Sequence, residues 1–374
     1  MMKLKRIAGA QTALLLLPGL LPAATIYSIV DLGALPGGSA TSAASVSSNG
    51  YVTGSGDTAS AFSQPFLWST VLGISAVDTD SGYAFGTGVN ASGTVVGYKF
   101  SDDFSNFTAF ANDGSGPTQI PTLGGANNAA TGINDAGTVV GYSEDGSGTE
   151  LAYVYDPTTG IATPLGVLPG GSTSSANAIN GTGLIVGEAD VGGLSHAVVL
   201  SGGAWIDLGV PSGSFGADSR TYQSSTATAV SNAGQIAGTL SGDDGSMAVL
   251  WQSDSSVVAL GALTAGGTSS AYGVNSSGEV VGTSDGVAFL FNGVGMHDLN
   301  SLLSSTSSGW QLTEGDAIND QGQIAGTGLI DGQQHAFLLT PDQSTPEPAT
   351  LPLVCGAVLL FAARCRHSFR KVKS

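Results

Sequence analysis

A short pattern recurs seven times along this chain and constrains its fold more than any other feature. Each copy contains, in this order, an apolar residue, Asn or Ser, two small or polar residues, Gly, any residue, an apolar pair and a last Gly. The copies are VSSNGYVTG, VNASGTVVG, INDAGTVVG, INGTGLIVG, VSNAGQIAG, VNSSGEVVG and INDQGQIAG. Their central glycines, which are 43, 44, 46, 51, 44 and 44 residues apart, are Gly50, Gly93, Gly137, Gly183, Gly234, Gly278 and Gly322. Such a period indicates one supersecondary unit repeated seven times.

Each unit is predicted to contain four short β-strands. The chain has 57 glycines, and its body is rich in Ser, Thr, Ala and Val, a composition that favours strands and tight turns over long helices. The residues before the pattern form the first strand, the pattern's central Gly occupies a left-handed turn position, and the apolar pair begins the second strand. The third strands, such as QPFLW and HAFLL, are apolar at consecutive positions, which indicates coverage on both faces. Segments such as VVALG form the fourth strand.

Seven four-stranded units of about 44 residues predict an all-β fold, a seven-bladed β-propeller spanning residues 25–340. The body begins with a fourth-strand copy, SIVDLG, and ends after a third-strand copy, HAFLL. We therefore expect the N-terminal strand to complete the last blade and remove an exposed edge. An open array of β-repeats is the alternative.

Residues 1–24 have the layout of a secretory signal peptide. A basic start is followed by the apolar stretch TALLLLPGLLPAA and by small residues at Ala23 and Ala24, so the mature chain should begin near Thr25. An uncleaved anchor is the alternative, although the apolar run is short and interrupted by prolines. The two cysteines, Cys355 and Cys365, lie in the C-terminal tail, so the exported domain contains no thiol.

The repeats resemble an extracellular repeat family named after its His-Ala-Phe motif, which stands at residues 335–337 and in altered form at His196 and Ala197. The resemblance implies a surface or secreted protein. The histidine is replaced in the other copies, by Gln64, Thr108, Leu151, Met247 and Val287. A catalytic role shared by all repeats is thus not expected, and we assign His196 and His335 a structural role.

The C-terminal tail contains Pro346, Glu347 and Pro348, then an apolar segment over residues 351–363, and then the basic residues Arg364 and Arg366. In this order of parts it resembles the PEP-CTERM sorting signal of exosortase-processed proteins in Gram-negative bacteria. The resemblance implies that residues 346–374, joined to the propeller by a linker at 341–345, insert transiently into the inner membrane as a transmembrane helix. The basic end would stay in the cytoplasm, and an exosortase-type enzyme would process the chain for the cell surface or medium. A plain C-terminal anchor is the alternative.

The net charge limits the partners. Asp and Glu number 28 against 10 Lys and Arg, and Lys99 and Arg220 are the only basic residues between Thr25 and Thr345. This charge disfavours nucleic acid and anionic lipid surfaces.

Several acidic loops could hold Ca²⁺ but lack the EF-hand spacing, so solvated turns are the stronger interpretation and no cofactor is expected. These loops contain Asp78, Asp80, Glu144, Asp145, Asp243 and Asp244. The LPGGS segments at Pro36 and Pro169 are not followed by Lys and Ser or Thr, and they do not lie between a strand and a helix. They are therefore predicted to be turns and not phosphate-binding loops.

Two functions fit these features. The first is a non-enzymatic surface or matrix protein associated with exopolysaccharide or a biofilm, favoured because no repeat stands out as chemically dense. The second is a lectin or a propeller enzyme acting on glycans. The insertion PSGSFGADSRTYQSS, in the 51-residue interval, supplies the candidate ligand loop with Asp218, Arg220 and Tyr222.

Overall fold

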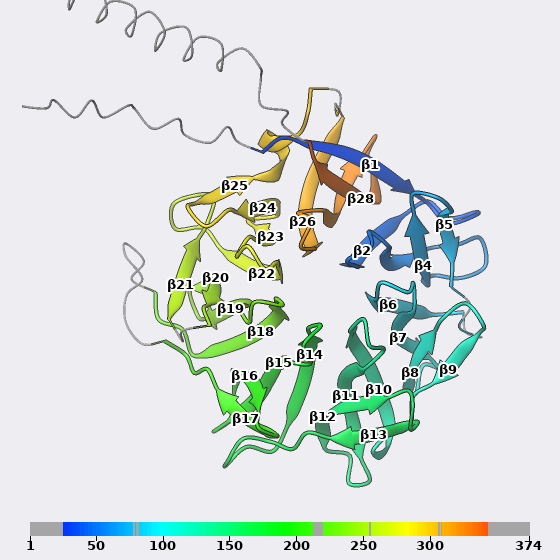
Figure 1. The fold of residues 1–374 in the computed structure, drawn as a ribbon, viewed down its shortest axis with the longest axis vertical. Coiled ribbons are helices and arrows are strands. Elements are labelled where there is room, and N and C mark those ends of the chain that lie inside the picture. The colour runs from blue at the N-terminus through cyan, green and yellow to red at the C-terminus, as the bar shows by residue number, and fades with distance from the viewer. Residues whose placement is uncertain are drawn as a thin grey trace, which may run out of the picture.

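The computed structural model describes residues 25–342 of this protein, except residues 78, 80–81, 212–219, 254–255, 306 and 308. Within these residues the strands form seven antiparallel sheets of four strands each. The sheets are arranged as blades around a central axis, so the predicted closed seven-bladed propeller is confirmed and the open array is wrong (Figure 1).

Every blade runs from an inner strand beside the axis to an outer strand at the rim (Figure 1). Blade 1 contains β2 (Thr41–Val46), β3 (Val52–Gly56), β4 (Gln64–Ser69) and β5 (Gly73–Ala76). Blade 2 contains β6 (Ala84–Val89), β7 (Val95–Phe100), β8 (Phe107–Asn112) and β9 (Pro117–Gln119). Blade 3 contains β10 (Gly124–Ile133), β11 (Val139–Asp145), β12 (Glu150–Asp156) and β13 (Ile161–Pro164). Blade 4 contains β14 (Ser174–Ile179), β15 (Ile185–Val191), β16 (Leu194–Ser201) and β17 (Ala204–Asp207).

The last three blades complete the ring. Blade 5 contains β18 (Ser224–Val230), β19 (Ile236–Gly242), β20 (Gly245–Trp251) and β21 (Val257–Gly261). Blade 6 contains β22 (Ser269–Val274), β23 (Val280–Ser284), β24 (Val287–Phe291) and β25 (Met296–Asp298). Blade 7 contains β26 (Trp310–Ile318), β27 (Ile324–Ile330), β28 (Gln333–Pro341) and, from the other end of the chain, β1 (Tyr27–Gly33).

The two glycines of the recurring pattern serve different purposes in the hairpin between the first and second strands. The central glycine of each copy has a φ between +76° and +86°, which confirms its left-handed turn position. The last glycine of the pattern lies in the second strand, opposite a shift of register in the inner strand that brings a carbonyl oxygen close to this glycine. A Cβ on Gly54 or Gly187 would lie 1.9 Å from the carbonyl oxygen of Ser42 or Ser175. Any side chain at these positions would displace the inner strand.

The third strands are buried on both faces, as the consecutive apolar residues predict. Phe337 of β28 is fully buried in a cluster that includes Val281 and Leu290 of blade 6. Ala336, on the other face, packs in a cluster with Val52 and Phe66 of blade 1. The hydrophobic core therefore lies between neighbouring blades, where sheet packs on sheet.

A hydroxyl at the start of an inner strand connects several blades. Thr41 Oγ1 accepts a hydrogen bond from the Ala336 amide at 3.0 Å and donates to the Gly33 carbonyl at 2.7 Å. Ser225 connects Ala197 and Gly209 in the same way between blades 4 and 5. The alanine of the His-Ala-Phe motif thus lies against the next blade, where its small side chain leaves room for this contact.

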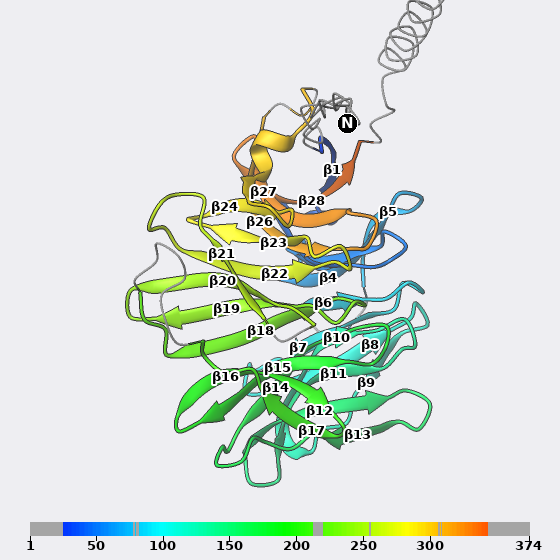
Figure 2. The same cartoon turned by 60° about the vertical axis from the view of Figure 1, so that its left-hand side comes forward.

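The N-terminal strand closes the ring, as predicted. β1 pairs antiparallel with β28 from Tyr27 opposite Pro341 to Gly33 opposite Ala336 (Figure 2). Tyr27 and Leu32 are only 1% and 3% exposed. Tyr27 packs on Leu302 beside blade 6, whereas Leu32 packs among residues of blade 1. β1 therefore covers the edge of β28 and contributes to the core on both sides of blade 7.

Helix is almost absent from the described residues. A single 3-10 turn, Leu299–Leu302, follows β25, and the Asp298 side chain caps it by accepting a hydrogen bond from the Asn300 amide. Nowhere in residues 25–342, as far as they are described, is a helix long and apolar enough to cross a membrane. The apolar segment 351–363 lies outside the described residues.

Candidate functional site

The antiparallel blades give the ring two different faces. The turns between first and second strands and between third and fourth strands lie on one face, here called the turn face. The hairpins between second and third strands and the connections between blades lie on the other, here called the loop face. The candidate functional residues are divided between these two faces.

On the turn face, asparagines of the recurring pattern connect neighbouring blades. Asn134 Oδ1 accepts hydrogen bonds from the amides of Ala136 and Thr138, which fixes its own turn. Its Nδ2 donates to the carbonyl of Asn180 in the next blade, 3.3 Å away. Asn90, Asn180, Asn275 and Asn319 make the same contact with the blade that follows. Their side chains therefore stabilise the ring as well as the turn, a role that the sequence analysis did not foresee.

The mouth of the central channel on the turn face is a polar cavity of about 220 Å³. Asp135 and Asp320 are carboxylates that line it. Asp135 Oδ1 accepts a hydrogen bond from the Ala91 amide, and Asp320 Oδ1 accepts one from the Ser276 amide, each at 2.8 Å. Both carboxylates thus bind the preceding blade, whereas the asparagines bind the following one.

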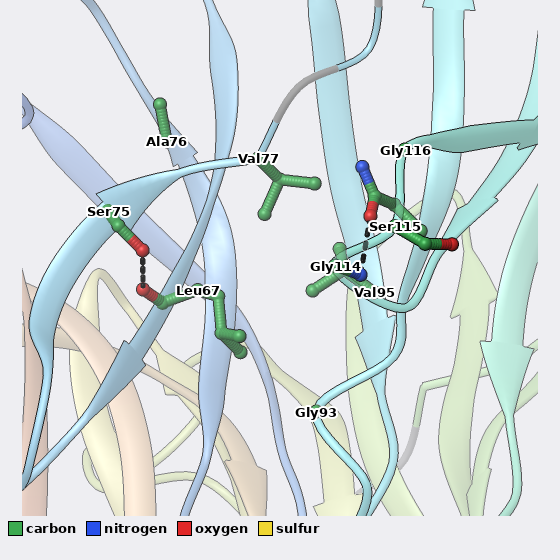
Figure 3. Close-up of a pocket in the computed structure, with 10 residues that line it drawn as sticks. Leu67, Ser75, Ala76, Val77, Gly93, Val95, Gly114, Ser115 and Gly116 are labelled. Carbon is green, nitrogen blue, oxygen red and sulfur yellow. Dashed lines mark hydrogen bonds between the residues drawn. The ribbon is translucent and has the colours of Figure 1, made fainter.

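A second hollow of the turn face lies between blades 1 and 2 and has a volume of about 380 Å³. Figure 3 shows Leu67 and Val77 on the blade 1 side, opposite Val95, Gly93 and the turn at residues 114–116. Its walls combine apolar side chains with the polar Ser75, Asn112 and Ser115. The Ser75 hydroxyl donates to the Leu67 carbonyl, and Asn112 Oδ1 accepts a hydrogen bond from the Gly114 amide, so these polar groups hold their own strands and turns.

On the loop face, aspartates clamp the Gly-Gly connections between blades. Asp57 Oδ1 accepts hydrogen bonds from the Ser39 and Ala40 amides at 2.8 and 2.6 Å. These hydrogen bonds lower the pKa of the Asp57 carboxyl. A Cβ on Gly38 would lie 1.9 Å from the Asp57 carbonyl oxygen, and Gly37 has a φ of +80°. The LPGGS segment is therefore a turn, as predicted from the sequence.

The same arrangement recurs in two further connections. Asp190 binds the amides of Ser172 and Thr173, and its pKa is lowered, first by the Thr173 amide. Asp285 binds the Thr264 hydroxyl and the Thr268 amide, and the Thr264 hydroxyl is the main cause of its lowered pKa. Glycine is required beside these aspartates because a side chain would collide with them.

Both histidines of the His-Ala-Phe pattern lie beside an aspartate of the fourth strand. His335 Nδ1 is 2.9 Å from Asp31 Oδ1, across the junction of the two chain ends. His196 Nδ1 is 2.9 Å from Asp207 Oδ2 within blade 4. These pairs connect third and fourth strands, an arrangement in keeping with the structural role assigned to them.

Blade 2 carries an aromatic cluster that the sequence analysis did not single out. We call it the aromatic row, and its members are Tyr83, Phe85, Tyr98, Phe100, Phe104, Phe107 and, from blade 3, Tyr142. Neighbouring rings have centroids 5.3 to 6.5 Å apart. Phe104 is 58% exposed and the other rings are half-buried. The row is an apolar surface on the loop face.

The register of the strands explains why these rings gather. Phe85 pairs with Tyr98, and Phe100 pairs with Phe107, so the four side chains share one face of blade 2. Thr87, two residues beyond Phe85, donates to the Ala130 carbonyl, so that face is turned toward blade 3. Partial burial raises the pKa of Tyr98, and the nearby Tyr83 adds to the effect.

An acidic pocket of about 290 Å³ adjoins this region between blades 3 and 4. Glu188 Oε2 accepts hydrogen bonds from Ser195 Oγ at 2.6 Å and from Thr226 Oγ1 at 2.9 Å. Burial raises the pKa of Glu150, and the charges of Glu188 and Glu144 raise it further. Glu150 pairs with Glu144, two residues from Tyr142 on β11, so the pocket adjoins the end of the aromatic row. Burial raises the pKa of Tyr142, and the charge of Glu150 raises it further.

The repeats diverge at one position in this region. The residue after the last glycine of the pattern is Tyr98, Tyr142 and Glu188 in blades 2 to 4. It is Ser55 in blade 1 and Thr239, Thr283 and Thr327 in blades 5 to 7. This difference is visible in an alignment of the repeats, so the sequence contained a signal for the site.

The structure separates two residues of the predicted ligand loop from this region. Arg220 lies over the Tyr222 ring, 5.8 Å from its centroid, and its charge contributes to the lowered pKa of Asp285. Tyr222 packs against the core cluster between blades 4 and 5. Asp218 lies outside the described residues.

Several other predicted site residues lie outside the part of the chain that the structure describes. Asp78, Asp80 and the sorting motif at residues 346–348, with Arg364 and Arg366, are not among the described residues. Asp145 accepts hydrogen bonds from Ser147 and Thr149 within its own turn, which lower its pKa. No group of three His, Cys, Asp or Glu side chains suited to a metal ion occurs in the part of the chain that is described.

No protein-family model matches the sequence, and no curated protein matches it either. The chain resembles a number of solved structures at a distance, including these three. The streptogramin B lyase structure is 9% identical, with a TM-score of 0.47, over 84% of this chain and 98% of that chain. The extracellular domain of a one-component system from B. thetaiotaomicron is 11% identical, with a TM-score of 0.43, over 83% of this chain but only 39% of that chain. A mutant of Aleuria aurantia lectin is 12% identical, with a TM-score of 0.36, over 87% and 99%. We infer no ligand or activity from similarities of this size.

Proposed function

We propose that this chain is an exported propeller of the cell surface or extracellular matrix that acts by binding, without catalysis, and reaches its location through PEP-CTERM processing. The main support is how the recurring polar residues are used. The asparagines of the turns, the aspartates of the Gly-Gly connections and the hydroxyls of the inner strands all bind neighbouring strands or blades. The repeats therefore supply a rigid scaffold, and the divergent surface over blades 2 to 4 is left for recognition.

The two ends of the sequence support the location. The signal-peptide layout of residues 1–24 favours export. The order of Pro-Glu-Pro, apolar segment and basic residues favours a tail that pauses in the inner membrane and is then removed. The strongly acidic body suits an exposed soluble domain, because like charges oppose self-association.

The test is the intact mass of the protein recovered from the cell surface or medium. Processing should remove the tail near residues 346–348, so both cysteines should be missing. Replacing Pro346, Glu347 and Pro348 with Ala should leave insertion intact and stop processing, so that full-length tail accumulates in the inner membrane. Replacing Ser344 and Thr345 with Ala is the matched control. Wild-type protein that keeps Cys355 and Cys365 at its final location would show the tail to be an ordinary anchor.

A further inference from the structure

We propose that the aromatic row and the adjoining acidic pocket bind a polysaccharide that carries free amino groups, with sugar rings on the aromatic side chains and ammonium groups at Glu150 and Glu188. This inference deepens the proposed function and rests on it, since a matrix protein must meet extracellular polysaccharide. It names the ligand class and the residues that bind it.

The propeller fold does not require the aromatic row. Blades 5 to 7 carry Thr239, Thr283 and Thr327 where blades 2 and 3 carry Tyr98 and Tyr142, and they form the same four-stranded sheets. A soluble domain seldom leaves such a group of rings partly in water unless the surface binds something. The row is therefore better explained by recognition than by packing.

The extent of the row suits a chain of pyranose rings. Aromatic side chains bury a large area at a small entropic cost, and their faces accept the polarised C–H groups of a pyranose. The rings continue from Phe104 through Phe100 and Phe107 to Tyr142, with neighbouring centroids at most 6.3 Å apart along that path. A continuous surface of this kind fits several consecutive sugars better than a single one.

The acidic side chains beside the aromatic row indicate which kind of sugar it binds. No hydrogen bond or ion pair joins the Glu150 side chain to another described residue, and both hydrogen bonds that the Glu188 side chain accepts reach the same oxygen, Oε2. Of the two basic residues in the body, Lys99 donates to the Thr79 carbonyl and Arg220 lies near Asp285. Among the described residues, therefore, neither Lys nor Arg supplies a cation to these carboxylates. An ammonium group would meet this need and could also lie against the ring of Tyr142.

The net charge of −18 excludes an anionic polysaccharide as the ligand. Uronic-acid or phosphate polymers would be repelled by the body and by the pocket. Neutral polymers could stack on the row but would leave the carboxylates without a cation. Charge complementarity thus favours an amino-sugar polymer.

The experiment measures binding of a glucosamine tetramer and of an N-acetylglucosamine tetramer to the purified full-length protein by calorimetry. Wild type should bind the glucosamine tetramer at least tenfold more tightly. Tyr98→Thr and Tyr142→Thr, which introduce the residue of blades 5 to 7, should each weaken that binding about tenfold. Glu150→Gln with Glu188→Gln should remove the preference for glucosamine, and wild-type binding should weaken as salt is added.

Val294→Ser is the matched control, since this side chain is 93% exposed in the turn between β24 and β25, on the turn face. It should bind as wild type does, and melting curves should show that all variants fold. Four results would overturn the inference: no binding of the glucosamine tetramer, unchanged binding in the tyrosine variants, equal affinity for both tetramers, or tighter binding of a lysine-rich peptide. The assay does not depend on where the protein resides, so its failure is distinct from a failure of the processing experiment.

Discussion

Closure of the ring by β1 predicts a large loss of stability when the two buried side chains of this strand are shortened. Tyr27→Ala removes a ring that is 1% exposed, and Leu32→Ala removes a side chain that is 3% exposed. Substitutions of buried Leu and aromatic residues by Ala cost about 2–5 and 3–5 kcal/mol respectively. The two side chains pack in separate clusters, so their effects should nearly add, to about 7 kcal/mol.

The expected change in melting temperature follows from the size of the domain. For large domains 1 kcal/mol corresponds to about 2 °C, so the double variant should melt roughly 14 °C below wild type. Leu72→Ala is the matched control, because it deletes the same atoms from a side chain that is 72% exposed, and it should change the melting temperature by about 1 °C or less. Circular dichroism against temperature measures both.

A second experiment isolates closure from core packing. Deleting residues 25–34 removes β1 and leaves the edge of β28 unpaired, which should promote aggregation. A synthetic peptide of residues 25–34 added to the truncated protein should restore solubility and much of the lost melting temperature. Equal melting temperatures for Leu32→Ala and Leu72→Ala, or a truncated protein as stable as wild type, would refute closure by this route.

Three further predictions concern the connections between blades. Asn319→Ala removes the hydrogen bond to the Ser47 carbonyl and three within its own turn, and should lower the free energy of unfolding in urea by about 1–3 kcal/mol; Asn319→Ser, the residue of blades 1 and 5, should cost less. Gly38→Ala forces a Cβ against the Asp57 carbonyl and should lower the melting temperature, unlike Gly82→Ala, where no atom lies within 4 Å; equal effects would contradict the clamp. The lowered pKa values of Asp57 and Asp190 stabilise the fold above about pH 4, and this contribution is lost as pH falls through the folded-state values. Asp57→Asn with Asp190→Asn should therefore lose less melting temperature between pH 6 and pH 3 than wild type does.

Local features of the sequence were sufficient to predict the blade. The turn glycines, the apolar pairs and the third strands act within a few residues, where backbone geometry and burial period are encoded directly. The ring could also be predicted, because seven copies and an unpaired fourth strand at the N-terminus leave one edge for it to join. The sequence alone thus determined the fold class, the number of blades and the partner of β1.

The contacts between blades were decided only by the tertiary structure. Asn134 bonds to a carbonyl 46 residues away, and His335 meets Asp31 across 304 residues. The aromatic row combines residues from 83 to 142 because strand register places Phe85, Tyr98, Phe100 and Phe107 on one face of blade 2, and Phe107 then contacts the Tyr142 ring of blade 3. Periodicity tells which strands pair, but which faces two blades present to each other depends on the bulges and twist of the assembled ring. An alignment of the repeats therefore shows that blades 2 to 4 diverge, but only the closed ring shows which side chains these blades bring together.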